Sequence, residues 1–149
     1  PCRARYFRPP KPGKIRVSPE ENVYFRFADG WNFSLAKPDR VVTYLADFWI
    51  WYRANEGRLH AVQLAATAYQ QLMRIHLFGD ANKRTTRLIR DFILQRNGYL
   101  PAIFTVNTYK VVFLNTAAVV KDTATGVIDA EKALSYPSRS PGSARSSRW

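Results

Sequence analysis

The chain has 149 residues, 46% of them hydrophobic, which suits one globular domain with a continuous core and leaves no room for a second full domain. Its 23 Lys and Arg against 11 Asp and Glu give a formal net charge of +12, a balance that favours acidic partners, although much of the charge lies near the two ends. The single cysteine, Cys2, excludes an intrachain disulfide and a cysteine-based zinc site, and no apolar run approaches the roughly 20 residues that span a bilayer.

The N-terminal part of the chain changes character at about residue 23. Residues 1–22 combine prolines with many cations, which is typical of an extended, weakly ordered arm. Residues 23–35 are rich in aromatic and β-branched side chains around a turn signal, Asp29-Gly30. The sequence therefore predicts a basic arm followed by a small β-hairpin.

Helical spacing of apolar residues follows Pro38, whose fixed φ suits the first turn of a helix. This spacing predicts a helix over residues 39–55, with Asp39 as its N-cap. It predicts a second, central helix over residues 59–75, because the many small side chains there suit close packing. His60, at the start of the second helix, is expected to have a structural role.

The remaining elements are predicted from spacing and composition. A third helix is predicted to run to Arg96, with Asn97-Gly98 as its C-cap. A last helix is predicted from about Asn107 to Lys121. Residues 135–149 are rich in Ser, Pro and Arg and are expected to be disordered.

The stretch from His76 to Arg87 lies between the second and third predicted helices and reads His-Leu-Phe-Gly-Asp-Ala-Asn-Lys-Arg-Thr-Thr-Arg. It brings together a base, a carboxylate, an amide and three cations. At the start of a helix, unpaired backbone N–H groups and the positive end of the helix dipole favour an anion. The sequence therefore predicts a site that handles the phosphates of a nucleotide.

This motif resembles the signature of Fic/Doc enzymes, H-x-F-x-D/E-G/A-N-G/K-R-x-x-R, and matches it at His76, Phe78, Asp80, Ala81, Asn82, Lys83, Arg84 and Arg87. The resemblance covers about residues 20–120. It implies an all-α fold, a Fic-type helical bundle with a small β-hairpin flap, in which Phe78 packs in the core. We expect a basic arm over residues 1–22, a catalytic domain over residues 23–134 and a tail over residues 135–149.

Each group in the motif suits one task. The imidazole of His76 can accept a proton from an attacking hydroxyl, so we expect His76 to be the catalytic base, open to the crevice that holds Arg84. The carboxylate of Asp80 is expected to hold Mg²⁺, which proteins bind through one or two carboxylates together with substrate phosphates. The expected ligands of the nucleotide phosphates are Asn82, Lys83, Arg84 and Arg87.

The resemblance implies transfer of a nucleoside monophosphate, AMP or UMP, from a nucleoside triphosphate to a Ser, Thr or Tyr hydroxyl of a target protein. Residues 81–85 resemble the Doc branch, in which the terminal phosphate is transferred, whereas Arg87 resembles the Fic branch. A Doc-like protein kinase is therefore the first alternative. A basic nucleic-acid-binding module is the second, and it ranks lowest because the chain has no RNP-like, zinc-finger or KH signature.

The remaining expectations concern setting and control. The cysteine content favours a reducing compartment, and we expect a cytoplasmic protein or a toxin or effector delivered into a host cytosol, with an antitoxin or other regulatory partner. The hairpin is expected to align a target segment by strand addition. The inhibitory motif of Fic proteins, S/T-x-x-x-E-G/N, is not matched, because its nearest candidate, Glu21-Asn22, has Val17 at the first position. We therefore expect no self-inhibition within this chain.

Overall fold

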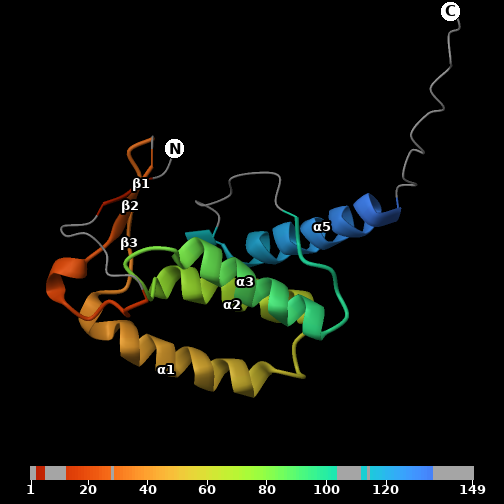
Figure 1. Ribbon diagram of the computed structural model, residues 1–149, viewed down its shortest axis with the longest axis horizontal. Coiled ribbons are helices and arrows are strands. Elements are labelled where there is room, and N and C mark those ends of the chain that lie inside the picture. The colour runs from red at the N-terminus through yellow and green to blue at the C-terminus, as the bar shows by residue number, and fades with distance from the viewer. Residues whose placement is uncertain (1–2, 6–12, 28, 104–111, 114, 136–149) are drawn as a thin grey trace, which may run out of the picture.

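The structure is a computed structural model, which describes residues 3–5, 13–27, 29–103, 112–113 and 115–135. This described part contains four long helices: α1 (Pro38–Asn55), α2 (Ala61–Ile75), α3 (Asn82–Arg96) and α5 (Thr116–Ser135). A small β-sheet lies at one end of the helical bundle (Figure 1). The predicted fold class, an all-α bundle with a small β-hairpin, is confirmed.

Helix α2 forms the centre of the bundle, where it packs against α1, α3 and α5 (Figure 1). Ala65, Ala66 and Ala68 have no exposed surface, and their short side chains let the neighbouring helices approach closely. Leu72 and Met73 are also buried, and each such side chain stabilises the fold by about 1.5–3 kcal/mol. The prediction of a central helix is confirmed, and the end of α2 that leads into the motif is anchored in the core.

The two helix starts differ in detail from their predictions. The N-cap of α1 is Lys37, and Asp39 lies instead in the first turn, where its negative charge still favours the positive end of the helix. His60 is the N-cap of α2, because its ring accepts a hydrogen bond from the backbone N–H of Val62 at 3.3 Å. The predicted structural role of His60 is therefore confirmed.

The sheet contains three antiparallel strands in the order β1-β2-β3, with β1 at Arg3–Arg5, β2 at Tyr24–Arg26 and β3 at Asn32–Ser34. The predicted hairpin is confirmed as β2 and β3. In its turn, Gly30 has a φ of 84°, a conformation that glycine adopts without strain. Strand β1 comes from the segment predicted to be an arm, and it extends the hairpin by one strand.

The expectation of a weakly ordered arm is corrected for residues 13–22, which pack on the bundle. Ile15 forms an isolated antiparallel bridge with Phe78, and the backbone N–H of Arg16 donates to the carbonyl of Leu77 at 2.8 Å. The side chain of Arg16 has no exposed surface. From composition alone, an arginine in such a segment is expected to be exposed to solvent. A guanidinium has five N–H donors, however, and it can be buried where the fold supplies enough backbone carbonyls to accept from them.

Helix α5 differs most from its prediction, because it runs to Ser135 and not only to Lys121. Its buried residues recur at helical spacing along most of this length: Val119, Thr123, Gly126, Val127 and Ala130. A Cβ atom at Gly126 would lie 2.6 Å from the carbonyl oxygen of Ile103, so this glycine permits a close backbone approach. The predicted start of this helix, at Asn107, and the tail beyond Ser135 lie outside the described residues. No helix in the described ranges is long and apolar enough to cross a bilayer.

Candidate active site

The motif begins where α2 ends. His76 is the C-cap residue of α2 and adopts a left-handed conformation with a φ of 54°, while its N–H still donates to the carbonyl of Leu72 at 2.9 Å. A left-handed residue at this position turns the chain away from the helix axis. Six residues later α3 starts at Asn82, so the motif occupies a tight connection between two packed helices.

Arg16 closes this end of α2. Its Nε donates to the carbonyl of His76 at 2.7 Å, and its Nη2 donates to the carbonyl of Ile75 at 3.2 Å. The same guanidinium reaches the carbonyls of Glu21 at 2.7 Å and Ala36 at 3.0 Å. The last carbonyls of a helix lack hydrogen-bond partners within the helix. Arg16, which is far away in the sequence, donates the missing hydrogen bonds. No local pattern distinguishes Arg16 from the neighbouring cations, so the sequence does not predict this role.

The imidazole of His76 is buried, with only 4% of the residue exposed. The ring of Phe25 in β2 meets it edge to face, with 5.4 Å between ring centroids. Neither ring nitrogen has a hydrogen-bond partner among the described residues. The predicted ring open to the crevice of Arg84 is therefore corrected: the ring is buried, and Phe25 of the flap lies against it.

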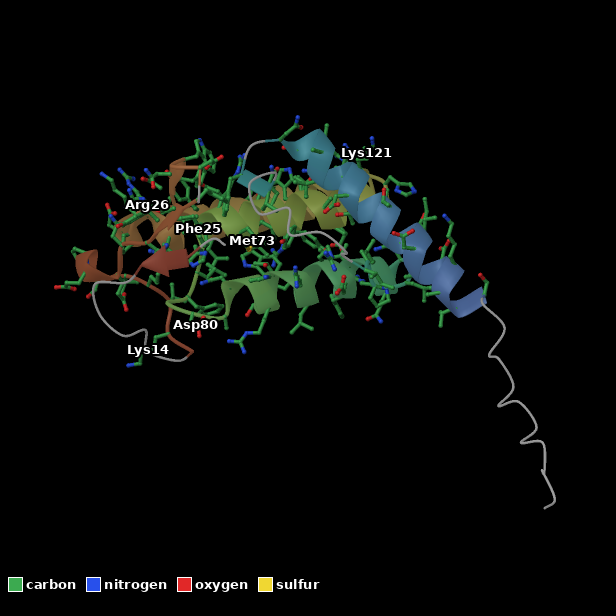
Figure 2. All side chains as sticks on the ribbon, turned by 90° about the horizontal axis from the view of Figure 1, so that it is seen from above. Lys14, Phe25, Arg26, Met73, Asp80 and Lys121 are labelled. Atoms are coloured by element: carbon green, nitrogen blue, oxygen red, sulfur yellow. The ribbon has the colours of Figure 1, made fainter. Side chains whose placement is uncertain are left out.

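Burial and, to a smaller extent, the nearby positive charge of Arg16 lower the pKa of His76 from 6.5 to about 3. The carbonyl of Met73 and the carboxylate of Asp80 partly oppose this shift, although the Met73 carbonyl is not in hydrogen-bond geometry with the ring. Figure 2 shows Phe25 close to Met73, with Asp80 at the same end of the molecule. His76 is consequently neutral near pH 7, the protonation state that a general base needs.

Asp80 is the exposed acid of the loop. Its Oδ1 accepts a hydrogen bond from the backbone N–H of Ala81 at 2.6 Å, and its Oδ2 lies 3.6 Å from Nη2 of Arg84, with both side chains more than 70% exposed. An ion pair this exposed contributes little and can open readily. No group of three potential protein ligands for a metal occurs in the described part of the chain. One accessible carboxylate nevertheless fits Mg²⁺, which takes most of its oxygen ligands from water and substrate phosphates.

The side chain of Asn82 is bonded to the backbone of its own loop. Its Oδ1 accepts a hydrogen bond from the backbone N–H of Phe78 at 2.8 Å, and its Nδ2 donates to the carbonyl of the same residue at 2.5 Å. The residue is only 3% exposed. The amide thus holds the loop closed across four residues, while Phe78 packs against the core as expected. These contacts show that Asn82 stabilises the loop, and its predicted binding of phosphate stays a prediction.

The backbone conformation of Ala81 explains why glycine is common at this position of the family motif. It is the N-cap of α3 and adopts a left-handed conformation with a φ of 66°. Glycine adopts this conformation freely, whereas a residue with a Cβ atom is strained by about 1–2 kcal/mol. The common family motif has glycine at this position, and the structure shows why glycine suits it. The loop retains the glycine-like turn despite the alanine.

The predicted phosphate-binding cations lie on the first turns of α3. Arg84 is exposed, whereas Lys83 and Arg87 are partly buried. One turn further, Arg90 is 1% exposed; it pairs with Asp91 at 2.6 Å and donates to the carbonyl of Ala102 at 2.9 Å. Burial lowers the pKa of Arg90, and the Asp91 carboxylate opposes this shift. Arg90 therefore stabilises the packing of the bundle. The cations near the loop are Lys83, Arg84 and Arg87.

Comparison with known proteins agrees with this arrangement. The sequence profile of the Fic/DOC family matches residues 5–94. The protein adenylyltransferase fic-1 of Caenorhabditis briggsae is 33% identical over 101 residues, which are 67% of this chain and 18% of that protein. The uridine 5'-monophosphate transferase of Xanthomonas campestris pv. campestris is 38% identical over 71 residues, which are 44% of this chain and 13% of that protein.

A solved structure has the same fold. It is a Fic domain containing signaling protein from Bacteroides thetaiotaomicron, which superposes with a TM-score of 0.55 at 25% sequence identity. The match covers 84% of this chain and 48% of that one. The chain is therefore similar to one domain of these proteins and spans less than a fifth of the length of the two relatives named above.

Proposed function

Because the chain belongs to the Fic/DOC family, we propose that it transfers a nucleoside monophosphate from a nucleoside triphosphate to a hydroxyl side chain of a target protein. Two relatives bear names of this type, an adenylyltransferase and a uridine monophosphate transferase. The structural observation that carries the proposal is the position of the His76 imidazole, whose nitrogens have no hydrogen-bond partner among the described residues. It lies at one end of a loop that carries Asp80 and leads into the cations of α3.

The proposed reaction is a single displacement at the α-phosphorus. The oxygen of the target hydroxyl forms a bond to this phosphorus, the bond from phosphorus to the bridging oxygen breaks, and pyrophosphate leaves. The proton of the hydroxyl passes to a ring nitrogen of His76, which is neutral and has no competing hydrogen bond from the described residues. The phosphate anions add negative charge near the ring, so their binding raises the pKa of His76 toward the range of an effective base.

The phosphates are proposed to bind at the start of α3. Backbone N–H groups of the first helical turn, the helix dipole and the side chains of Lys83, Arg84 and Arg87 favour anions there. Mg²⁺ bound through Asp80 would offset phosphate charge as pyrophosphate departs. Asn82 keeps the loop in shape through its two bonds to Phe78.

The regulation of this activity is also a proposal. The carboxylate of Glu21 accepts hydrogen bonds from the backbone N–H groups of Val17 and Ser18 at 2.9 and 3.1 Å. This glutamate is therefore engaged within its own short segment, which supports the absence of self-inhibition through it. We propose that a regulatory or antitoxin partner controls the activity, in the cytoplasm or in a host cytosol that receives the protein as an effector.

The mass of the modified target tests the proposed function. The protein is incubated with each nucleoside triphosphate, Mg²⁺ and a cell lysate, and the modified Ser, Thr and Tyr peptides are weighed. We expect the mass of a nucleoside monophosphate, and we expect it to disappear in His76→Ala but not in the matched control His60→Ala. An added phosphate alone would assign the kinase reaction. Function that survives His76→Ala and consists of binding nucleic acid with an affinity that falls steeply with salt would assign the nucleic-acid-binding module.

A further inference from the structure

A cavity of about 690 Å³ opens between the end of β3, the first half of α1 and the end of α2. Its volume lies within the range of ligand-binding clefts, roughly 300–1,000 Å³. None of the motif residues from His76 to Arg87 lines it, so it is separate from the proposed phosphate site. Its wall nevertheless contains Ile75, the residue directly before His76.

The charged residues of the cavity are mostly cations. Lys37 and Arg40 come from the start of α1, Arg74 comes from the last turn of α2, and Asp47 is the single acid. Arg74 is held in place because its Nη2 donates to the carbonyl of Phe113 at 2.7 Å. Among the described residues, Arg40 has an exposed contact with Asp39 at 3.9 Å, and a contact this exposed is too weak to neutralise the charge of Arg40. The cavity therefore suits a ligand with negative charge.

The remaining walls suit a polypeptide segment. The aromatic side chains of Tyr44 and Trp51 provide apolar surface from α1, and the amide of Gln71 provides a hydrogen-bonding group from α2. Such a mixture of apolar walls, a few polar groups and net positive charge fits an acidic side chain together with the hydrocarbon part that carries it.

The cavity also lies beside the edge of the sheet. In the strand order β1-β2-β3, strand β3 is an outer strand of the described sheet, and its residues Phe33 and Ser34 contribute to the cavity wall. In the hairpin, the N–H of Phe27 donates to the carbonyl of Trp31, and the N–H of Leu35 donates to the carbonyl of Val23. Along β3, residues whose backbone groups bond to β2 therefore alternate with residues whose backbone groups point away from it. This alternation directs the backbone groups of Asn32 and Ser34 to the outer edge, where a further strand can pair.

One hydrogen-bonded path joins the cavity wall to the proposed base. The N–H of Ala36, in the wall, donates to the carbonyl of Arg74 at 3.3 Å, and the carbonyl of Ala36 accepts from Arg16, which also holds the carbonyl of His76. The cavity and the base are therefore fixed relative to one another. A segment held in the cavity has a defined position with respect to His76.

We propose that this cavity binds acidic side chains of the target segment that pairs with β3, so that Lys37 and Arg40 select acidic targets. The inference rests on the proposed function, because it names the chemical class of its protein substrate. Strand pairing uses backbone groups and reads few side chains, whereas the cavity supplies a charge-selective contact beside it. A nucleotide would also bring negative charge, and the experiment below separates the two ligands.

The test is a binding titration without nucleotide. A short fluorescent strand-forming peptide with Asp and Glu at alternate positions is compared with the same peptide carrying Asn and Gln, using fluorescence anisotropy at low salt. We expect the acidic peptide to bind at least about tenfold more tightly than the neutral one. Lys37→Glu combined with Arg40→Glu should remove this difference, and Asp47→Asn should increase the affinity for the acidic peptide severalfold.

Arg53→Glu is the matched control, because Arg53 is an exposed cation on α1 that does not line the cavity. It should keep the preference for the acidic peptide, and circular dichroism should show every variant folded. Equal binding of both peptides, or a preference lost equally in Arg53→Glu, would overturn the proposal. Displacement of the peptide by ATP from wild-type protein but not from Arg84→Gln would assign the charge effect to the phosphate site and would also overturn it. The titration measures peptide binding and not transfer. Its outcome is therefore distinguishable from a failure of the proposed reaction.

Discussion

The guanidinium of Arg16 and the carbonyl of His76, 60 residues apart in the sequence, are joined by a hydrogen bond of 2.7 Å between Nε and the oxygen. Through its other donors the same side chain holds the end of α2, the segment before the flap and the segment after it. One buried cation thus fixes the backbone from which the proposed base projects and contributes to the low pKa of that base.

Replacement of Arg16 tests this relationship. Lysine has the same charge but lacks the planar fork, so Arg16→Lys leaves several buried carbonyls without donors. We expect a loss of about 3–5 kcal/mol in the free energy of unfolding and a melting temperature lower by about 10 °C. Lys14→Gln, a change at an exposed cation two residues away, is the control and should leave the melting temperature unchanged. A shift of Arg16→Lys no larger than that of Lys14→Gln would show that the bonds do not stabilise the fold.

The pH dependence of stability reports the burial of His76. Its pKa is about 3 in the folded protein and 6.5 in a model peptide, so between these values the unfolded chain binds a proton that the folded chain does not. The contribution of neutral His76 to the free energy of unfolding is therefore fully present above pH 6.5. It falls as the pH decreases toward 3, by up to about 1.4 kcal/mol per pH unit. Urea unfolding near pH 7 and near pH 4.5 should show a weaker pH dependence in His76→Asn than in the wild type. Identical slopes would mean that the ring is protonated in the folded state.

Removal of the Asp80 carboxylate tests the proposed metal contact. Asp80→Asn keeps the size of the side chain but removes the negative oxygen ligand, so we expect transfer to fall at least about 100-fold and to need more Mg²⁺. Because the side chain is exposed, the free energy of unfolding should change by less than about 0.5 kcal/mol. Asp39→Asn, an exposed acid in the first turn of α1, serves as the matched control. Full activity of Asp80→Asn, or of wild type in excess EDTA, would contradict the assignment.

The left-handed conformation of Ala81 predicts a stabilising substitution. Ala81→Gly relieves a strain of about 1–2 kcal/mol and costs about 0.5–1 kcal/mol through the greater freedom of the unfolded chain, so a net gain of about 0.5–1 kcal/mol is expected. The measurement is urea unfolding of the two proteins. Ala46→Gly, at an exposed position in the interior of α1, should instead destabilise by up to about 1 kcal/mol. If both substitutions destabilise equally, Ala81 is not strained in solution.

Local patterns were sufficient for much of this molecule. The apolar spacing that predicts α1 and α2, the Asp29-Gly30 turn and the Asn97-Gly98 end of α3 all act over a few residues, so neighbouring residues alone determine them. The motif from His76 to Arg87 is also contiguous in the sequence. Its location between two helices and its membership of the Fic/DOC family follow from that short stretch, and the structure confirms the location.

Only the tertiary structure decided how these parts meet. Residues that are tens of positions apart meet in three places: at buried Arg16, where Phe25 contacts His76, and in the cavity beside β3. No local sequence pattern encodes which distant residue will supply the carbonyl or the ring for such a contact. The backbone contacts of Asn82 and Arg90 have the same origin, because the partners of a polar side chain depend on which groups the packed core brings within hydrogen-bond distance. Chemical identity is thus a property of the sequence, whereas exposure, pKa and partner are properties of the assembled fold.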